Sequence, residues 1–159
     1  MADRQNYDML VERALGDVSE LAPWDLEADR EALYGDAQAP LLVDVREGEE
    51  FAAGSIPGSL NVPRGILEAA CDFGFAETCV ELVQARLRPV VVICRSGRRS
   101  ALAAQTLIQL GYSDVKSLKL GVKGWNDSEF PLVDGAGNPV DPEQAEIFLS
   151  PKISPEQLG

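Results

Sequence analysis

Two short and almost continuous aliphatic runs dominate the hydrophobic pattern of this chain. The runs Leu41–Val45 and Val90–Ile93 each follow a proline and hold hardly any polar residue. Such runs are typical of central strands in a parallel sheet, because these strands are covered on both faces. Weaker apolar runs predict three further strands, at Val18–Leu21, Leu60–Val62 and Val115–Leu118.

Longer segments between these runs repeat their apolar positions at helical spacing. They predict four helices, at Tyr7–Leu15, Pro23–Tyr34, Ala76–Leu87 and Ser100–Leu110. The last is the clearest, since Gly111 follows it directly and suits a left-handed C-cap. Strands that alternate with helices in this way predict an α/β fold with a mainly parallel sheet.

The end of the chain has a different composition. Past Phe130 the sequence is rich in proline and glycine, which is typical of a tail laid over a domain or left mobile. We therefore expect three parts: an N-terminal helical extension over residues 1–16, one domain over 17–133, and a C-terminal tail over 134–159.

Composition and charge exclude several classes of partner. The 159 residues are 45% apolar and 25% charged, which suits one globular domain. With 26 acidic and 14 basic residues the formal net charge is −12, so the chain would repel nucleic acid and anionic membrane surfaces. The sequence shows neither an apolar leader nor a stretch long enough to span a membrane. We expect a cytoplasmic protein with no nucleic-acid or membrane partner.

The candidate chemistry lies where the strand Val90–Ile93 ends, a place where α/β sheets put their binding crevices. Backbone N–H groups of a loop at this place, together with the positive end of the following helix, can form a nest that stabilises an anion. Glycine in the loop supplies the backbone freedom that such a nest requires. The residues that follow the strand are Cys94, Arg95, Ser96, Gly97, Arg98, Arg99 and Ser100.

Local charge favours a reactive thiolate at Cys94. The segment 82–113 contains no Asp or Glu but five arginines. The helix start and the arginines Arg95, Arg98 and Arg99 each favour a thiolate, and the positive field suits an anionic substrate. Because alternate side chains diverge in a tight loop, we expect Arg95 and Arg99 to matter more than Arg98. The chain has no histidine, which excludes Ser-His triads, Cys-His dyads and histidine-bearing zinc sites.

The other two cysteines lack such a setting. Cys71 and Cys79 lie in or beside an ordinary helical segment with no basic neighbours, and we expect structural roles for both. Three cysteines form an odd and sparse set, which fits reduced thiols rather than a disulfide framework. The sequence holds no cluster of metal ligands and no glycine-rich nucleotide motif, so we expect neither a metal nor a cofactor.

Several motifs follow one another in a characteristic order. They are Leu42–Arg46 with Glu50–Phe51, then Gly54–Pro63, the loop Cys94–Ser100, Gly111–Tyr112, Val115, and the closing pattern Leu120–Gly121, Trp125 and Pro131. In order and spacing they resemble the rhodanese family of sulfurtransferases, in its single-domain form, over roughly residues 18–132. The resemblance implies a rhodanese-like domain with a five-stranded, mainly parallel sheet and helices on both faces.

The resemblance also implies a persulfide mechanism. The Cys94 thiolate attacks the outer sulfur of thiosulfate or a similar small anionic donor, sulfite leaves, and the persulfide gives its sulfur to a thiol, to cyanide or to a protein acceptor. The loop Arg95–Ser100 binds the donor and holds the persulfide. In this family the Asp and Arg of the D-V-R motif are mostly structural, so Asp44 and Arg46 are interpreted as structural residues near the site.

Two positions depart from the family pattern. Ser55 stands where a histidine is common, and Gly121–Val122 stands where two glycines are usual before the last helix. Neither position belongs to the loop that carries Cys94. They do not change the predicted activity, but they concern the choice of acceptor and the local packing.

Three alternatives stay open beside sulfur transfer from thiosulfate. A phosphatase would need Cys-x5-Arg, but Ser100 occupies that place and the loop Cys94–Arg99 has the shorter, sulfur-sized length. A persulfide carrier or a non-catalytic docking module would keep the same loop. A redox variant would close a disulfide between Cys94 and either Cys71 or Cys79.

Overall fold

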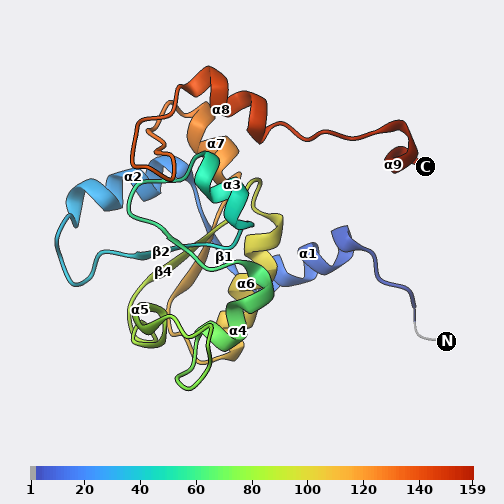
Figure 1. Cartoon of the computed structure of the whole chain (residues 1–159). Helices are drawn as coiled ribbons and strands as arrows, with labels where there is room; N and C mark the ends of the chain where they lie inside the picture. The colour runs from blue at the N-terminus through green and yellow to red at the C-terminus, as the bar shows by residue number, and fades with distance from the viewer. Residues whose placement is uncertain (1–2) are drawn as a thin grey trace.

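A computed structural model describes residues 3–159 of the chain. At its centre lies a five-stranded sheet in the order β1-β5-β4-β2-β3, and every pair of neighbouring strands is parallel. Helices cover both faces of this sheet (Figure 1). The predicted α/β fold is confirmed, and the sheet is parallel throughout.

All five predicted strands are present, and their ends agree with the predicted ends to within one residue. The two central strands, β2 and β4, have every residue buried, as their continuous aliphatic runs indicate. Asp44 pairs with Ile93 in the register, so β2 and β4 end at the same edge of the sheet. The strands are β1 (Ser19–Leu21), β2 (Leu41–Asp44), β3 (Leu60–Asn61), β4 (Val90–Ile93) and β5 (Val115–Leu118).

One face of the sheet packs under α4 (Leu67–Ala70), α5 (Val80–Val83) and α6 (Arg98–Gln109). Its core includes Val92 of β4 and Leu107 of α6, both fully buried. Burial of such aliphatic side chains is the main force that holds these layers together.

The opposite face packs under α2 (Pro23–Ala32), α7 (Gly121–Asp127) and α8 (Pro142–Leu149). Its core includes Val91 of β4 and the indole of Trp125. Because Val91 and Val92 face opposite ways, β4 is fixed from both sides and its carboxyl end is held rigidly.

A helix near the N-terminus, α1 (Tyr7–Asp17), lies against α6. Val11 and Ala14 of α1 form a small apolar cluster with Ala101 of α6. The predicted helices at Tyr7–Leu15, Pro23–Tyr34 and Ser100–Leu110 correspond to α1, α2 and α6, with ends that differ by at most two residues.

The helix predicted over Ala76–Leu87 is wrong for most of its length, since only Val80–Val83 is α-helical. The side chain of Thr78 explains the difference at the start of this segment. Its hydroxyl donates to the carbonyl of Asp72 and accepts from the N–H of Phe75. Local hydrogen bonds of this kind stabilise a turn in competition with a helix.

The hydrophobic pattern did not reveal the remaining short helices, because they hold too few turns to show a period. Among them, α3 begins with a capping box between Glu47 and Glu50, which is a local signal for a helix start. These helices are α3 (Gly48–Ala53), the 3-10 helix η1 (Arg64–Ile66), α4, α7, α8 and α9 (Pro155–Leu158).

The proline- and glycine-rich end of the chain is partly laid over the domain. Val133 bridges to Ser55, and α8 buries Ala145 and Leu149. Beyond Ser150 the chain runs away from the body of the molecule to α9 (Figure 1). The division of the chain into three parts stays a prediction.

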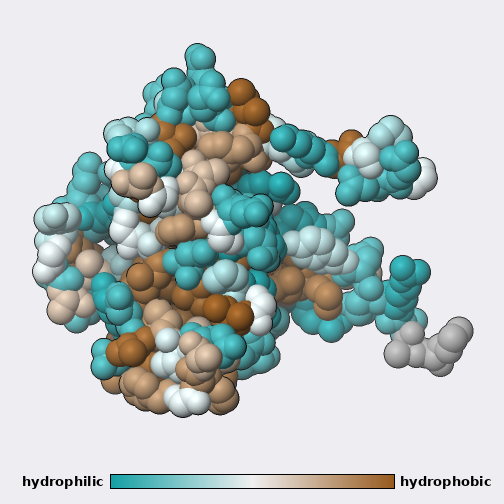
Figure 2. All heavy atoms as spheres, in the orientation of Figure 1, coloured by the Kyte–Doolittle hydropathy of each residue, from teal (hydrophilic) through white to brown (hydrophobic). Residues whose placement is uncertain are grey.

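Hydrophobic surface gathers at the end of the molecule where α4 and α5 lie, at the lower edge of Figure 2. The segment between these helices exposes Phe73, Phe75 and, at the start of α5, Val80. Among residues 3–159, no helix is long and apolar enough to cross a membrane.

Candidate active site

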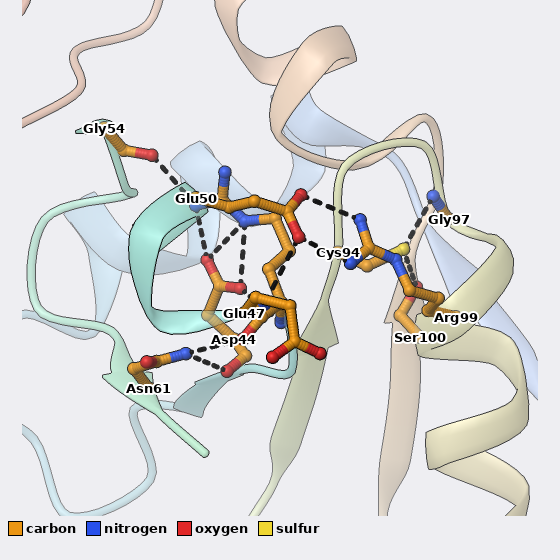
Figure 3. Close-up of polar contacts among 10 residues, drawn as sticks. Asp44, Glu47, Glu50, Gly54, Asn61, Cys94, Gly97, Arg99 and Ser100 are labelled. Carbon is orange, nitrogen blue, oxygen red and sulfur yellow. Dashed lines mark hydrogen bonds and ion pairs between the residues drawn. The ribbon is translucent and has the colours of Figure 1, made fainter. Parts of the chain in front are cut away.

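Cys94 directly follows β4 and is almost fully buried. Its Sγ atom accepts a hydrogen bond from the backbone N–H of Gly97, with 3.1 Å between the two atoms. The hydroxyl oxygen of Ser100 lies 3.3 Å from the same sulfur (Figure 3). Two polar groups of the loop therefore face the sulfur, at the point where β4 meets β2 on one side and β5 on the other.

Only glycine suits position 97. Gly97 has a φ of +96°, and a Cβ there would come within 3.3 Å of the carbonyl oxygen of Leu118 and 3.4 Å of the nitrogen of Leu120. A side chain would be both strained and crowded. The left-handed turn at Gly97 lets its N–H point at the sulfur while α6 begins at the next residue, which brings the positive end of the helix to the loop.

A second segment fixes the loop from the side of α7. The backbone N–H of Val122 donates to the carbonyl of Cys94 at 2.9 Å, and that of Lys123 donates to the carbonyl of Arg95 at 3.0 Å. Gly121 makes this approach possible, since a Cβ on it would lie 2.3 Å from the Cys94 carbonyl oxygen. Cys94 is thus held through its main chain as well as through its sulfur.

The backbone is left-handed at two successive positions where α7 begins. The two successive residues with left-handed backbone are Leu120, with a φ of 66°, and Gly121, with a φ of 60°. Val122 is an ordinary helical residue of α7. The residue that stands where a glycine would be unstrained is therefore Leu120, and its half-exposed side chain lies beside the loop.

The three loop arginines have different surroundings. Arg98 forms an ion pair with Asp8 and lies over the ring of Tyr7, so it connects the loop to α1. Arg99 forms a two-pronged ion pair with Glu50 of α3, with distances of 2.7 and 2.9 Å (Figure 3). Arg95 takes part in none of the ion pairs found among residues 3–159.

The Glu50–Arg99 pair also changes the titration of both groups. The hydrogen bond from Arg99 lowers the pKa of Glu50, against the opposing effect of partial burial. The same hydrogen bond raises the pKa of Arg99. Both side chains are about one third exposed, so solvent screens the attraction between them. The pair therefore positions Glu50 and Arg99 as much as it stabilises the fold.

Asp44 and Arg46 form a buried ion pair that does not touch the sulfur. The Arg46 guanidinium donates to both carboxylate oxygens of Asp44 and, at 2.8 Å, to the carbonyl of Gly54. The amide of Asn61 donates to the backbone carbonyls of both residues. These contacts fix the chain between β2 and α3, and hence the position of Glu50 (Figure 3).

A residue that the sequence did not single out lies behind Ser100. The hydroxyl of Ser117, on β5, is 2.8 Å from that of Ser100, and both side chains are fully buried. A lone serine in a short strand carries no local signal of this role. Of the other predicted residues, Ser96 is exposed on the loop, and Ser55 is buried and bonded through its main chain to Val133.

The three cysteines are free thiols. Cys71 is buried, and burial raises the pKa of its thiol, whereas Cys79 is half-buried. The disulfide between Cys94 and one of them stays a prediction. Within the described part of the chain, His, Cys, Asp and Glu form no group of three or more suited to a metal ion.

Comparisons of the sequence with known proteins indicate one family. Residues 29–128 match the family described as the Rhodanese-like domain. A protein of Allochromatium vinosum named as a sulfurtransferase is 34% identical over 114 residues, which are 70% of this chain and 97% of that protein. A mitochondrial protein of Schizosaccharomyces pombe, whose name puts it forward as a thiosulfate sulfurtransferase, is also 34% identical, over 62% of this chain and 76% of that protein.

One solved structure superposes on most of this chain. It is a Rhodopseudomonas palustris protein described as being of unknown function and as a possible tyrosine phosphatase. The two chains superpose with a TM-score of 0.72 at 27% identity, over 83% of this chain and 97% of that one.

Proposed function

This chain belongs to the family of Rhodanese-like domains and is a rhodanese-like sulfurtransferase, and on that premise we propose that it transfers sulfane sulfur from thiosulfate or a similar donor through a persulfide on Cys94. The acceptor is a thiophile such as cyanide or a thiol, or a thiol of a partner protein. The sparse cysteines favour a reducing, cytoplasmic setting for this reaction.

The observation that carries the proposal is the pair of polar groups at the Cys94 sulfur. The Gly97 N–H and the Ser100 hydroxyl lie 3.1 and 3.3 Å from Sγ, at the positive end of α6. The Gly97 N–H donates to the sulfur, and the Ser100 hydroxyl, which accepts from the thiol, can turn to donate to a thiolate or a persulfide. They would serve the thiolate before the reaction and the persulfide after it.

The reaction then consists of two displacements. In the first, the Cys94 thiolate forms a bond to the outer sulfur of thiosulfate, the sulfur–sulfur bond of thiosulfate breaks, and sulfite leaves with the electron pair. In the second, the acceptor attacks the terminal sulfur of the persulfide, and the Cys94 thiolate is released. No histidine is needed in either step, and the sequence has none.

Arg95 is the loop arginine best suited to hold the anionic donor, because its charge is not compensated by an ion pair among the described residues. Arg99 and Arg98 are held by Glu50 and by Asp8, and they fix the loop to α3 and to α1. Gly97 and Ser100 contact the sulfur itself.

Mass spectrometry of the protein after incubation with thiosulfate, without reductant, tests the proposal. We expect a gain of one sulfur atom on the Cys94 peptide, lost on addition of cyanide or a thiol, and no gain in Cys94→Ser. Cys71→Ser is the matched control, and it should gain the sulfur as the wild type does.

Two outcomes would favour other functions. A folded protein that gains no sulfur from thiosulfate, but that receives sulfur from a partner protein or binds one regardless of Cys94→Ser, would be a carrier or a docking module. Hydrolysis of an aryl phosphate that depends on Cys94 would make the protein a phosphatase, although Ser100 stands where such enzymes need arginine.

A further inference from the structure

The last residues of the chain form an arm that the body of the molecule does not hold. After α8 the chain runs away from the sheet to the single turn of α9, and we call residues 151–159 the arm (Figure 1). Its hydrogen bonds are those of its own helical turn, and no ion pair joins it to residues 3–150. One helical turn is not stable by itself in water, so the arm needs a surface to pack on.

The arm presents apolar side chains beside one positive charge. Ile153 and Leu158 are 59% and 74% exposed, and burial of such aliphatic side chains is favourable. Lys152 directly precedes Ile153 and has no ion-pair partner among the described residues. The one acidic side chain of the arm, Glu156, follows further along, in the first turn of α9. The part of the arm best suited to docking is therefore a cation followed by an aliphatic group.

A cleft with matching chemistry lies elsewhere on the molecule. It has a volume of about 480 Å³ and opens between α2 and the segments that precede β2 and β3. Clefts of about 300–1,000 Å³ hold drug-sized ligands, so this one has room for an aliphatic side chain and its main chain. Its apolar lining consists of Tyr34, Ala39, Pro40, Leu42 and Pro57.

The charged groups that line the cleft leave one carboxylate without a partner. Glu27 and Arg30 form an ion pair at 3.0 Å, and Arg30 also donates to the backbone carbonyl of Pro57. Glu31 is exposed and forms no ion pair among residues 3–159. The lining therefore carries one uncompensated negative charge, which is opposite in sign to Lys152 of the arm.

The arm of one molecule does not reach its own cleft. The segment that follows α2 lies at the left of Figure 1, whereas α9 lies at the right. Ile153 is only three residues beyond Ser150, a reach of about 10 Å, and the Ser150 hydroxyl donates to the carbonyl of Glu146 in α8. Arm and cleft thus lie on opposite sides of the molecule, and a second molecule is needed to bring an arm to the cleft.

We propose that the arm of one copy of this chain docks in the cleft of the next copy, so that the protein self-associates head to tail. The Ile153 side chain packs against Tyr34 and Pro40 of the other copy, and the Lys152 ammonium pairs with the Glu31 carboxylate. Contacts between two different patches of one chain are heterologous, and they build rings or open chains. This association does not depend on the sulfur transfer proposed above.

Sedimentation velocity at physiological ionic strength tests the proposal, because salt screens the repulsion between copies that each carry a formal charge of −12. We expect the average mass of the wild type to rise above that of one chain as its concentration is raised. Lys152→Glu and Glu31→Lys should each weaken the association by at least about tenfold, since each brings two like charges together. A mixture of the two variants should associate again, because it contains a native pair and a reversed pair.

Further variants keep this test specific. Lys119→Glu and Glu81→Lys make the same changes of charge at exposed positions outside the arm and the cleft, and both should associate as the wild type does. Ile153→Asp spoils the arm and Tyr34→Ala spoils the cleft, so each variant alone should be monomeric. Mixed together, they should form a complex of one chain of each, because one intact arm and one intact cleft remain.

Three results would overturn the proposal. The first is a wild type that stays monomeric at every concentration, and the second is association of folded Lys152→Glu and Glu31→Lys that equals that of the wild type. The third concerns the exposed aromatic side chains before α5. Association that is lost in Phe75→Ser but kept in Ile153→Asp would place the contact between copies at that surface.

Discussion

The hydroxyls of Ser100 and Ser117 lie 2.8 Å apart in the buried interior, and the sulfur of Cys94 lies 3.3 Å beyond Ser100. The Cys94 sulfur and the two hydroxyl oxygens form a row of three atoms that are connected by two hydrogen bonds. With a thiol, the S–H donates to Ser100, Ser100 can donate to Ser117, and the Ser117 hydrogen is free to bond outside this row. A thiolate and two hydroxyls carry two hydrogens for two links, and each link is then satisfied. The two hydroxyls can therefore turn to donate toward the sulfur once its proton has left.

Replacing Ser117 by alanine should make Cys94 less reactive. Without Ser117, the Ser100 hydroxyl loses the partner that orients it toward the sulfur. One neutral hydrogen bond is worth about 1 kcal/mol, so we expect an alkylation rate about fivefold lower near neutral pH. The measurement is the rate of alkylation by iodoacetamide at pH 7. Ser96→Ala, at an exposed serine of the same loop, is the control, and a rate in Ser117→Ala equal to that of wild type would contradict the account.

Cys94 and Cys71 should differ sharply in their importance for activity. Cys94→Ser should reduce sulfur transfer to background while the thermal unfolding midpoint changes little, because serine has nearly the same shape but is a far weaker nucleophile. Cys71→Ser should keep most of the activity, since Cys71 is a buried thiol at the end of α4 and is not part of the loop. Rates of thiocyanate formation and thermal melts check both. Loss of activity in a Cys71→Ser protein of unchanged stability would show that its role is more than structural.

The loop arginines should contribute unequally to donor binding. Arg95→Ala should raise the thiosulfate KM by about tenfold, as expected for the loss of one charge-assisted hydrogen bond. Arg98→Ala should raise it by less than about twofold, because Arg98 is held by Asp8 and Tyr7 on α1. Steady-state kinetics with cyanide as acceptor give both values. A larger effect at Arg98 than at Arg95 or Arg99 would reverse the assignment.

The Glu50–Arg99 pair predicts a specific dependence of stability on pH. Since the hydrogen bond from Arg99 lowers the pKa of Glu50 in the folded protein, the pair stabilises the fold above the ordinary glutamate pKa of about 4.3. This stabilisation is lost as the pH falls through the folded-state pKa. The melting temperature of Glu50→Gln should therefore lie below that of wild type at pH 6, and the difference should shrink toward pH 3. Glu81→Gln, at an exposed and distant glutamate, should show no such convergence.

Much of this site followed from local sequence. The aliphatic run Val90–Ile93 fixed a central strand, and the residues from Cys94 to Ser100 placed a thiol, a glycine turn and a helix start in one loop. The partners of these groups could not be found in the same way. Glu50 and Ser117 reach the loop from other elements of the fold, and nothing near them in the chain marks that contact.

Short helices were also difficult to predict from the sequence. Helix α8 lies in a segment whose prolines and glycines indicated a tail, although Asp141 caps its start and Pro142 occupies its first turn. That local signal was available and would have found the helix. The start of the predicted helix over 76–87 failed for the opposite reason, because the hydrogen bonds of Thr78 to the main chain stabilise a turn despite the apolar period.

The two left-handed residues beside the loop should respond oppositely to substitution. Gly121→Ala should destabilise the protein strongly, since its Cβ would overlap the Cys94 carbonyl. Leu120→Gly should be neutral or stabilising, because a left-handed leucine costs about 1–2 kcal/mol, partly offset by the flexibility that glycine adds to the unfolded chain. Urea unfolding measures both. A Leu120→Gly protein much less stable than wild type would show that its side chain packs more than its backbone strains.

Position 120 also limits what can occupy position 124. A Cβ on Gly124 would lie 2.3 Å from the Cβ of Leu120, so the two places cannot both carry side chains with this backbone. Gly124→Ala should be tolerated only together with Leu120→Gly. Among natural relatives the two sites should therefore vary as a pair, and an evolutionary path from one combination to the other should pass through a protein with glycine at both.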